Sequence, residues 1–145
     1  MMKWLKGLGK KKEVKPSYST FVTPTQYQSV QFQELQSKVH GNALKKGFWK
    51  DYAEVQLMKP VLKDEVYLAQ YLNCVGQRLM LIASEVGEAE EALRTENMYN
   101  FQEEVADIVI RCMDLAGGLG FDLFEEIQKK HQYNLNRTYK HGKKF

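Results

Sequence analysis

Residues 68–93 read LAQYLNCVGQRLMLIASEVGEAEEAL and carry the clearest periodic pattern of the chain. Apolar side chains recur there in alternating steps of four and three, which is the spacing of one face of an α-helix. They are Leu68, Leu72, Val75, Leu79, Ile82, Val86, Ala89 and Leu93. The stretch therefore predicts a long amphipathic helix whose apolar stripe contributes to a core.

A second helix is predicted immediately downstream. Its apolar stripe consists of Phe101, Val105, Ile108, Cys112, Leu115 and Leu119. Asn100 with Glu103 has the spacing of a capping box, and Gly120 is a typical helix end. Only three polar residues interrupt residues 105–116, so we expect this helix to be buried nearly all round.

The sequence before residue 68 contains another helix and an aromatic segment. Residues 23–26 read TPTQ, a typical helix start, and we expect a helix from there to about Lys46, ended by Gly47. Residues 48–52 read FWKDY and are predicted to form an aromatic-rich loop.

The last helix is expected to open at Asp122, with Glu125 in its first turn, and to run towards Arg137. No stretch has the alternation of a strand. The pattern predicts an all-α bundle of four to five helices. Residues 1–22 are expected to be an irregular basic segment, and residues 23–145 one helical domain with a basic tail.

Composition narrows the class of protein. The chain has 145 residues, 43% hydrophobic and 27% charged, which suits one globular domain. No apolar run reaches the roughly 20 residues of a membrane-spanning helix, and no secretion signal is recognisable. Cys74 and Cys112 are the only cysteines and both lie inside helical patterns, which favours reduced core thiols and a cytoplasmic protein. Lysines crowd both ends and leave an acidic body, which suits a metal site better than a DNA-binding face.

The acidic body contains two pairs of carboxylates at helical spacing. Glu85 and Glu88 lie three residues apart, and so do Glu104 and Asp107. If the two helices pack antiparallel, the four carboxylates meet. Oxygen ligands without histidine or cysteine select a hard ion such as Mg²⁺ or Mn²⁺. The alternative is that each pair belongs to a solvated helix face.

These residues also resemble a family. The stretches ASEVGEAEEA (residues 83–92), EEVADIVI (103–110) and KHQYN (130–134) resemble the MazG-type all-α nucleoside triphosphate pyrophosphohydrolases. The similarity spans about residues 40–142. It implies an enzyme that splits a nucleoside triphosphate into monophosphate and pyrophosphate, with the four carboxylates as magnesium ligands and a homodimer or homotetramer as the assembly.

The resemblance also implies substrate contacts. Lys130 and Asn134, with Arg137 in the same element, would contact the phosphates or sugar. His40 and Trp49 stand where the related dCTP pyrophosphatases place residues beside the base.

Alternatives remain for several of these residues. Lys130 also suits the helix dipole, and Asn134 is an ordinary residue for a helix C-terminus. Trp49 is equally consistent with a core position. Arg111 is a candidate for substrate contact or for an ion pair with Asp114 on its own helix.

The mechanism expected from this resemblance uses a carboxylate to orient the attacking water. Glu103 is one candidate, and the expected ligands, Glu104 among them, are the others. The competing hypothesis is a non-catalytic helical module that uses its basic tails to bind nucleotides or nucleic acid. Four clustered carboxylates argue against it, and we do not expect a nucleic-acid partner.

Overall fold

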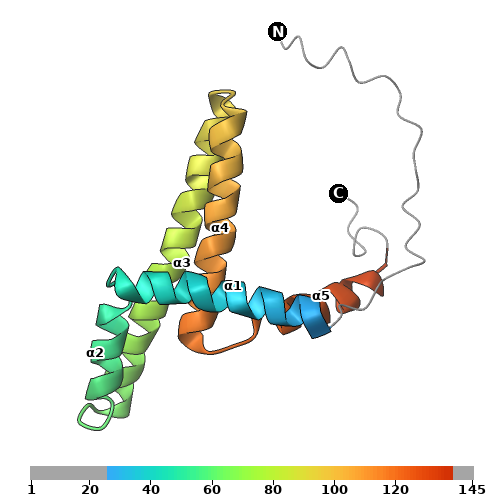
Figure 1. Cartoon of the computed structure of the whole chain (residues 1–145). Coiled ribbons are helices and arrows are strands. Elements are labelled where there is room, and N and C mark those ends of the chain that lie inside the picture. Colours follow the sequence, from blue (N-terminus) through green and yellow to red (C-terminus); the bar gives the residue numbers. More distant parts are fainter. Residues whose placement is uncertain (1–25, 139–145) are drawn as a thin grey trace, which may run out of the picture.

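The computed structural model describes residues 26–138, so the expected helix start at residues 23–25 and both basic ends lie outside the described residues. This part of the chain is all-helical, as predicted, with five helices and no strand (Figure 1). They are α1 (Gln26–Lys45), α2 (Lys50–Met58), α3 (Asp64–Arg94), α4 (Met98–Leu119) and α5 (Leu123–Leu135).

The longest helices, α3 and α4, form an antiparallel hairpin that is the spine of the molecule (Figure 1). A turn joins them, in which Glu96 adopts a positive φ of 56° and the Thr95 hydroxyl donates to the Glu91 carbonyl oxygen. Two small side chains, Ala89 and Ala92, are buried on α3 near this turn. Their size lets the two backbones approach closely.

The shorter helices surround one half of this hairpin. Helix α1 packs against α4, α2 packs against α3, and α5 packs against α1 (Figure 1). The end of the hairpin near the turn projects away from α1, α2 and α5. No helix within residues 26–138 is long and apolar enough to cross a membrane.

The predicted helix ends are confirmed in part. Gly120 ends α4 in the left-handed conformation with φ 76°, and the Asp122 side chain caps α5 by accepting from the Glu125 amide. The cap expected at Asn100 is wrong by about one turn. Asn97 is the N-cap of α4, and its side chain accepts from the Asn100 amide, because the tight turn after α3 lets the helix begin earlier.

Two other boundaries differ from expectation. The predicted aromatic loop at residues 48–52 is instead a turn followed by the first residues of α2, which begins at Lys50. The last helix ends at Leu135, two residues before Arg137.

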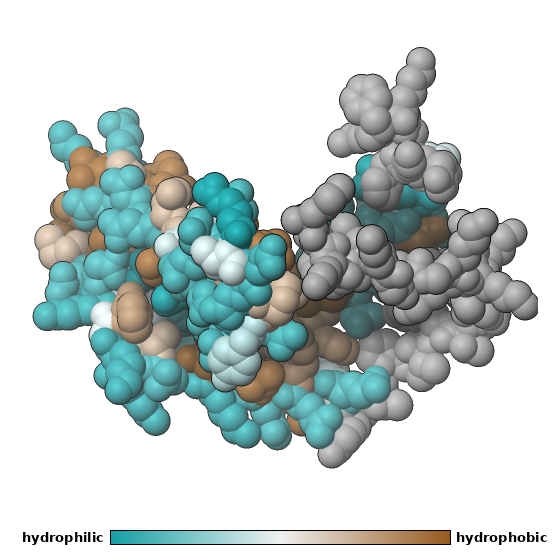
Figure 2. All heavy atoms as spheres, turned by 90° about the horizontal axis from the view of Figure 1, so that it is seen from above, coloured by the Kyte–Doolittle hydropathy of each residue, from teal (hydrophilic) through white to brown (hydrophobic). Residues whose placement is uncertain are grey.

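The main correction concerns the apolar stripe of α3, which was predicted to contribute to the core. Leu68, Leu72, Leu79, Val86 and Leu93 are each exposed. Figure 2 shows that apolar side chains reach the surface of the molecule among the hydrophilic ones. Of the stripe only Ala89 is buried, while Val75 and Ile82 are half-buried. The other buried residues of α3 lie beside the stripe and are Cys74, Arg78, Glu85 and Ala92.

Helix α4 also differs from the expectation that it is buried all round, because Val105, Val109 and Ile110 are exposed. Periodicity locates an apolar face, but whether another helix covers that face depends on the packing.

Candidate functional site

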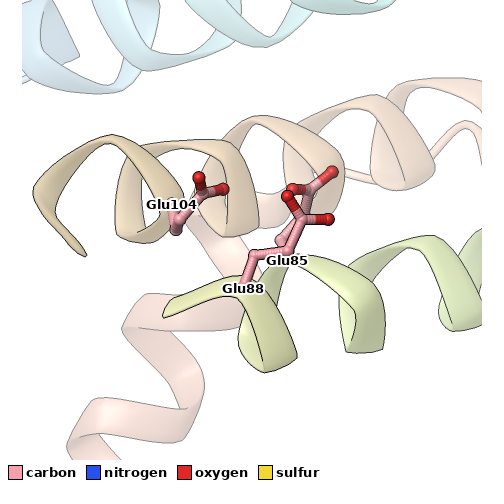
Figure 3. Close-up of side chains that lie close together, drawn as sticks. All are labelled: Glu85, Glu88 and Glu104. Carbon is pink, nitrogen blue, oxygen red and sulfur yellow. The ribbon is translucent and has the colours of Figure 1, made fainter. Parts of the chain in front are cut away.

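Three glutamates meet between the two helices of the hairpin. Glu85 and Glu88 project from α3 and Glu104 from α4, and one carboxylate oxygen of each lies within 4.8 Å of the others (Figure 3). We call these three residues the acidic cluster. The turn at residues 95–97 folds α4 back along α3, which brings residues 16 to 19 positions apart face to face.

Burial differs among the three glutamates. Glu85 is buried, Glu104 is half-buried, and Glu88 is exposed and accepts a hydrogen bond from the Ser84 hydroxyl at 3.2 Å. A buried carboxylate needs a cationic or hydrogen-bonding partner to remain charged. Arg111 of α4 provides one, with its Nε 3.0 Å from Glu85 Oε1.

The charges of the acidic cluster act on one another. Partial burial raises the pKa of Glu104, and the negative charges of Glu88, Glu85 and Asp107 raise it further. This is the direction expected where like charges are held together without a counter-ion. The cluster is therefore a place where a cation would relieve repulsion.

The structure does not bring all the expected acidic residues together. The side chain of Asp107, expected as a fourth ligand, is exposed and lies outside the group of three, although its charge acts on Glu104. Glu103 is exposed on α4, one residue before Glu104. Asp107 remains a candidate ligand because its charge acts on Glu104. Glu103 remains a candidate for orienting water from its place in the sequence alone.

A second polar group lies beside the hairpin, around a buried tryptophan. Asp114 Oδ1 accepts from Trp49 Nε1 and from His40 Nδ1, both at 2.8 Å. The guanidinium of Arg78 lies 4.0 Å from the centre of the Trp49 ring, and the ring of Tyr52 meets its edge. We call these five residues the aromatic centre.

Trp49 is almost completely enclosed in the aromatic centre, with only 3% of its surface exposed. Gly118 of α4 allows this approach, because a Cβ atom there would lie 1.9 Å from the Trp49 ring. The ring is therefore unavailable for stacking on a base unless the centre opens. Its packing supports the alternative of a core tryptophan.

Arg78 links α2 to α3. It binds both carboxylate oxygens of Asp51, at 2.7 and 3.2 Å, and donates to the main-chain carbonyl oxygens of Cys74 and Phe48. This pairing lowers the pKa of the Asp51 carboxyl to about 2. Asp51 was not among the residues predicted from the sequence. The available signal was an acidic residue beside aromatic ones, together with an arginine on the buried face of α3.

His40 lines an open pocket of about 510 Å³, together with Trp49, Tyr52, Gln56 and Gly118. This pocket lies among α1, α2 and the end of α4. Its lining mixes apolar groups with a few polar ones, as small-molecule sites do.

The expected phosphate-binding residues lie elsewhere. Lys130 and Asn134 are exposed on α5, and Arg137 is exposed just beyond its end. Lys130 Nζ and the Arg137 guanidinium lie near the ring of Tyr133. Helix α5 packs against α1, so this chain by itself does not bring these residues to the acidic cluster.

The acidic cluster lies between the two helices of the hairpin and offers three carboxylates as ligands, which suits a hard divalent cation. Arg111 beside it adds a cation that suits phosphate oxygens. No protein-family model, curated protein or solved structure matches the chain.

Proposed function

We propose that this chain is a magnesium-dependent nucleoside triphosphate pyrophosphohydrolase. The observation that supports the proposal most is the convergence of Glu85, Glu88 and Glu104 within 4.8 Å on two packed helices. The sequence motifs that resemble the MazG-type enzymes contain the same three residues. Mn²⁺ would be an effective substitute, since it prefers the same oxygen ligands.

The donor set fits magnesium by its chemistry. All three groups are carboxylates, and no histidine or cysteine belongs to the cluster. Partial burial and the neighbouring negative charges both raise the pKa of Glu104. Glu85 has one oxygen bonded to Arg111, which leaves its other oxygen as a ligand. When bound, magnesium would neutralise phosphate charge and assist ionisation of the attacking water.

The protein's own carboxylates would handle the proton. In the proposed reaction the water oxygen attacks the α-phosphorus, the bond from that phosphorus to the bridging oxygen breaks, and pyrophosphate leaves. Glu103 or Glu104 would accept the proton of the water. A raised pKa makes the Glu104 carboxylate a stronger base than an ordinary one at neutral pH.

The substrate contacts would come from basic residues. Arg111 is the closest to the acidic cluster among those expected. Lys130, Asn134 and Arg137 would reach the phosphates of a site only from a second copy of the chain or after a movement of α5, because α5 packs on α1. His40 at the open pocket would contribute to recognition of the base.

We further propose that the chain assembles as a homodimer or homotetramer. The support is the exposed apolar stripe of α3, beside which residues 72–81 border a groove of about 840 Å³. A second copy of the hairpin would cover this stripe and complete a helical bundle. Light scattering at tens of micromolar should give a dimer or tetramer, and a monomer there would contradict this part of the proposal.

The activity is tested with a panel of ribo- and deoxynucleoside triphosphates in Mg²⁺, with the products separated by chromatography. At least one substrate should yield monophosphate and pyrophosphate in equal amounts. Release of orthophosphate with a diphosphate product, or no turnover with any common triphosphate, would contradict the proposal.

A further inference from the structure

Glu85 is shared between two electrostatic environments. Its carboxylate belongs to the acidic cluster, with oxygens of Glu88 and Glu104 within 4.8 Å, and it also accepts from Arg111 Nε at 3.0 Å. Arg111 and Glu104 lie seven residues apart on α4, about 10 Å along the helix axis. The carboxylate of Glu85 therefore meets α4 between the cationic side chain of Arg111 and the anionic side chain of Glu104.

The bond between Arg111 and Glu85 uses only part of the guanidinium. A strong arginine–carboxylate pair is bidentate, with two parallel N–H donors, as Arg78 makes with Asp51. Arg111 donates to Glu85 through Nε alone, and within residues 26–138 its two terminal nitrogens make no hydrogen bond. These nitrogens carry four N–H donors that remain available to an oxyanion.

The position of Arg111 also opposes a metal ion. A divalent cation held by Glu85, Glu88 and Glu104 would lie close to the guanidinium, and the two positive charges would repel each other. The cation and Arg111 would also compete for the same buried carboxylate. Arg111 thus stabilises Glu85 in the ligand-free protein and would weaken metal binding at the same site.

We propose that Arg111 is a tethered counter-ion that is displaced from Glu85 when a divalent cation binds and then turns its free N–H donors to the phosphates of the substrate. This inference rests on the proposed function. It makes Arg111 a positioning residue for Glu85 before binding and a phosphate ligand afterwards. By linkage, metal and polyphosphate each strengthen the binding of the other through Arg111.

The displacement is observable by NMR of arginine side chains in the full chain. The sequence has only four arginines, so the Nε–H signal of Arg111 is assigned by its loss in Arg111→Lys. Adding Mg²⁺ alone should shift or broaden this signal, and then adding inorganic tripolyphosphate should shift it again. The signal of Arg94, which pairs with Glu91 on the exposed face of α3, should stay unchanged.

Calorimetric titration with Mg²⁺ measures the competition. Arg111→Gln should bind Mg²⁺ about five- to tenfold more tightly than the natural chain, the low end of ordinary coupling between sites. Arg111→Lys keeps the charge and should remain close to the natural affinity. Arg94→Gln removes the same charge from α3 away from the cluster and is the matched control, with unchanged affinity.

The outcomes separate this inference from the proposed function. If Mg²⁺ binds and a nucleotide is hydrolysed, but the Arg111 signal does not move and Arg111→Gln binds Mg²⁺ no more tightly, only the role of Arg111 is overturned. If Mg²⁺ does not bind the natural chain in the millimolar range, the metal site fails and the proposed function with it.

Discussion

The acidic cluster and the aromatic centre lie on the same hairpin but differ in how their polar groups are satisfied. In the aromatic centre each charge has partners, because Asp114 accepts twice and Arg78 is held by Asp51 and two carbonyl oxygens. Only Nε of Arg78 is buried there without a hydrogen-bond partner among the described residues. In the acidic cluster three carboxylates lie together, and Arg111 beside them makes a single hydrogen bond, to Glu85. A satisfied polar group stabilises the fold, whereas an under-compensated one leaves room for a ligand.

This difference predicts that substitutions in the acidic cluster affect activity far more than stability. Glu88→Gln, Glu104→Gln and Asp107→Asn should each reduce turnover by about a hundredfold or more, because a lost ligand costs at least as much as a lost outer-shell partner. Glu85→Gln should do the same. Turnover on the nucleotide panel and melting temperature, measured on each variant, check this.

The control for these variants is Glu90→Gln, which removes an exposed carboxylate from the same helix outside the cluster. It should keep normal turnover. Glu85→Gln should also lower the melting temperature slightly, since Arg111 loses its ion-pair partner. Near-normal turnover in all four variants, of Glu85, Glu88, Glu104 and Asp107, would show that the active site lies elsewhere.

The aromatic centre should show the opposite behaviour. Trp49→Ala empties a buried site and removes the hydrogen bond to Asp114, so we expect a loss of about 3–5 kcal/mol in the free energy of unfolding. Urea denaturation measures this loss. Tyr99→Ala removes an exposed aromatic ring and should change stability by less than about 0.5 kcal/mol.

The KM of the folded Trp49→Ala protein should be nearly unchanged if the ring is only part of the core. A tenfold rise in KM without loss of stability would instead support the stacking role beside the base.

A smaller effect is expected where α2 joins α3. Asp51→Asn leaves the buried guanidinium of Arg78 without its anionic partner, which should cost about 1–3 kcal/mol, because the carbonyl oxygens of Phe48 and Cys74 still accept from it. The folded-state pKa of Asp51 is about 2, below its ordinary value of 3.8. Its stabilising contribution is therefore complete above pH 3.8 and is lost as the pH falls towards 2.

Denaturation of the natural chain and of Asp51→Asn at pH 6 and at pH 2.5 should reveal this dependence. The difference in stability between the two proteins should shrink at the lower pH. An equal difference at both pH values would show that the carboxylate charge is not what stabilises the contact.

The smallest effect concerns Glu104 in the metal-free protein. Its pKa is raised on folding, so its contribution to stability is present below its ordinary pKa of 4.5 and is lost as the pH rises through the folded-state value. Glu104→Gln should therefore be slightly more stable than the natural chain at neutral pH without Mg²⁺. Melting temperatures at pH 4 and pH 7.5 in EDTA would show the gain only at the higher pH.

Local signals predicted much of the secondary structure. The apolar period of residues 68–93, the capping pair of Asp122 and Glu125, and the glycine at position 120 each act within a few residues, and all three mark helices or ends that are present. The positions of Glu85, Glu88 and Glu104 likewise predicted that their side chains meet. Two helices joined by a short turn pack antiparallel, which brings these residues face to face.

Packing between helices settled what local patterns could not. Arg111 and Asp114 have the spacing of an ion pair on one helix, yet Arg111 pairs with Glu85 of α3 while Asp114 binds His40 of α1 and Trp49 at the start of α2. The apolar stripe of α3 was visible in the sequence, but five of its eight side chains are exposed within residues 26–138.

The sequence by itself thus determined the helical class, some helix ends and three of the four acidic residues that were expected to meet. Only the tertiary structure decided which partners satisfy each charge and which apolar face is enclosed. The reason is physical: helix periodicity and capping depend on neighbours within about four residues, whereas burial and pairing depend on helices that are distant in the chain.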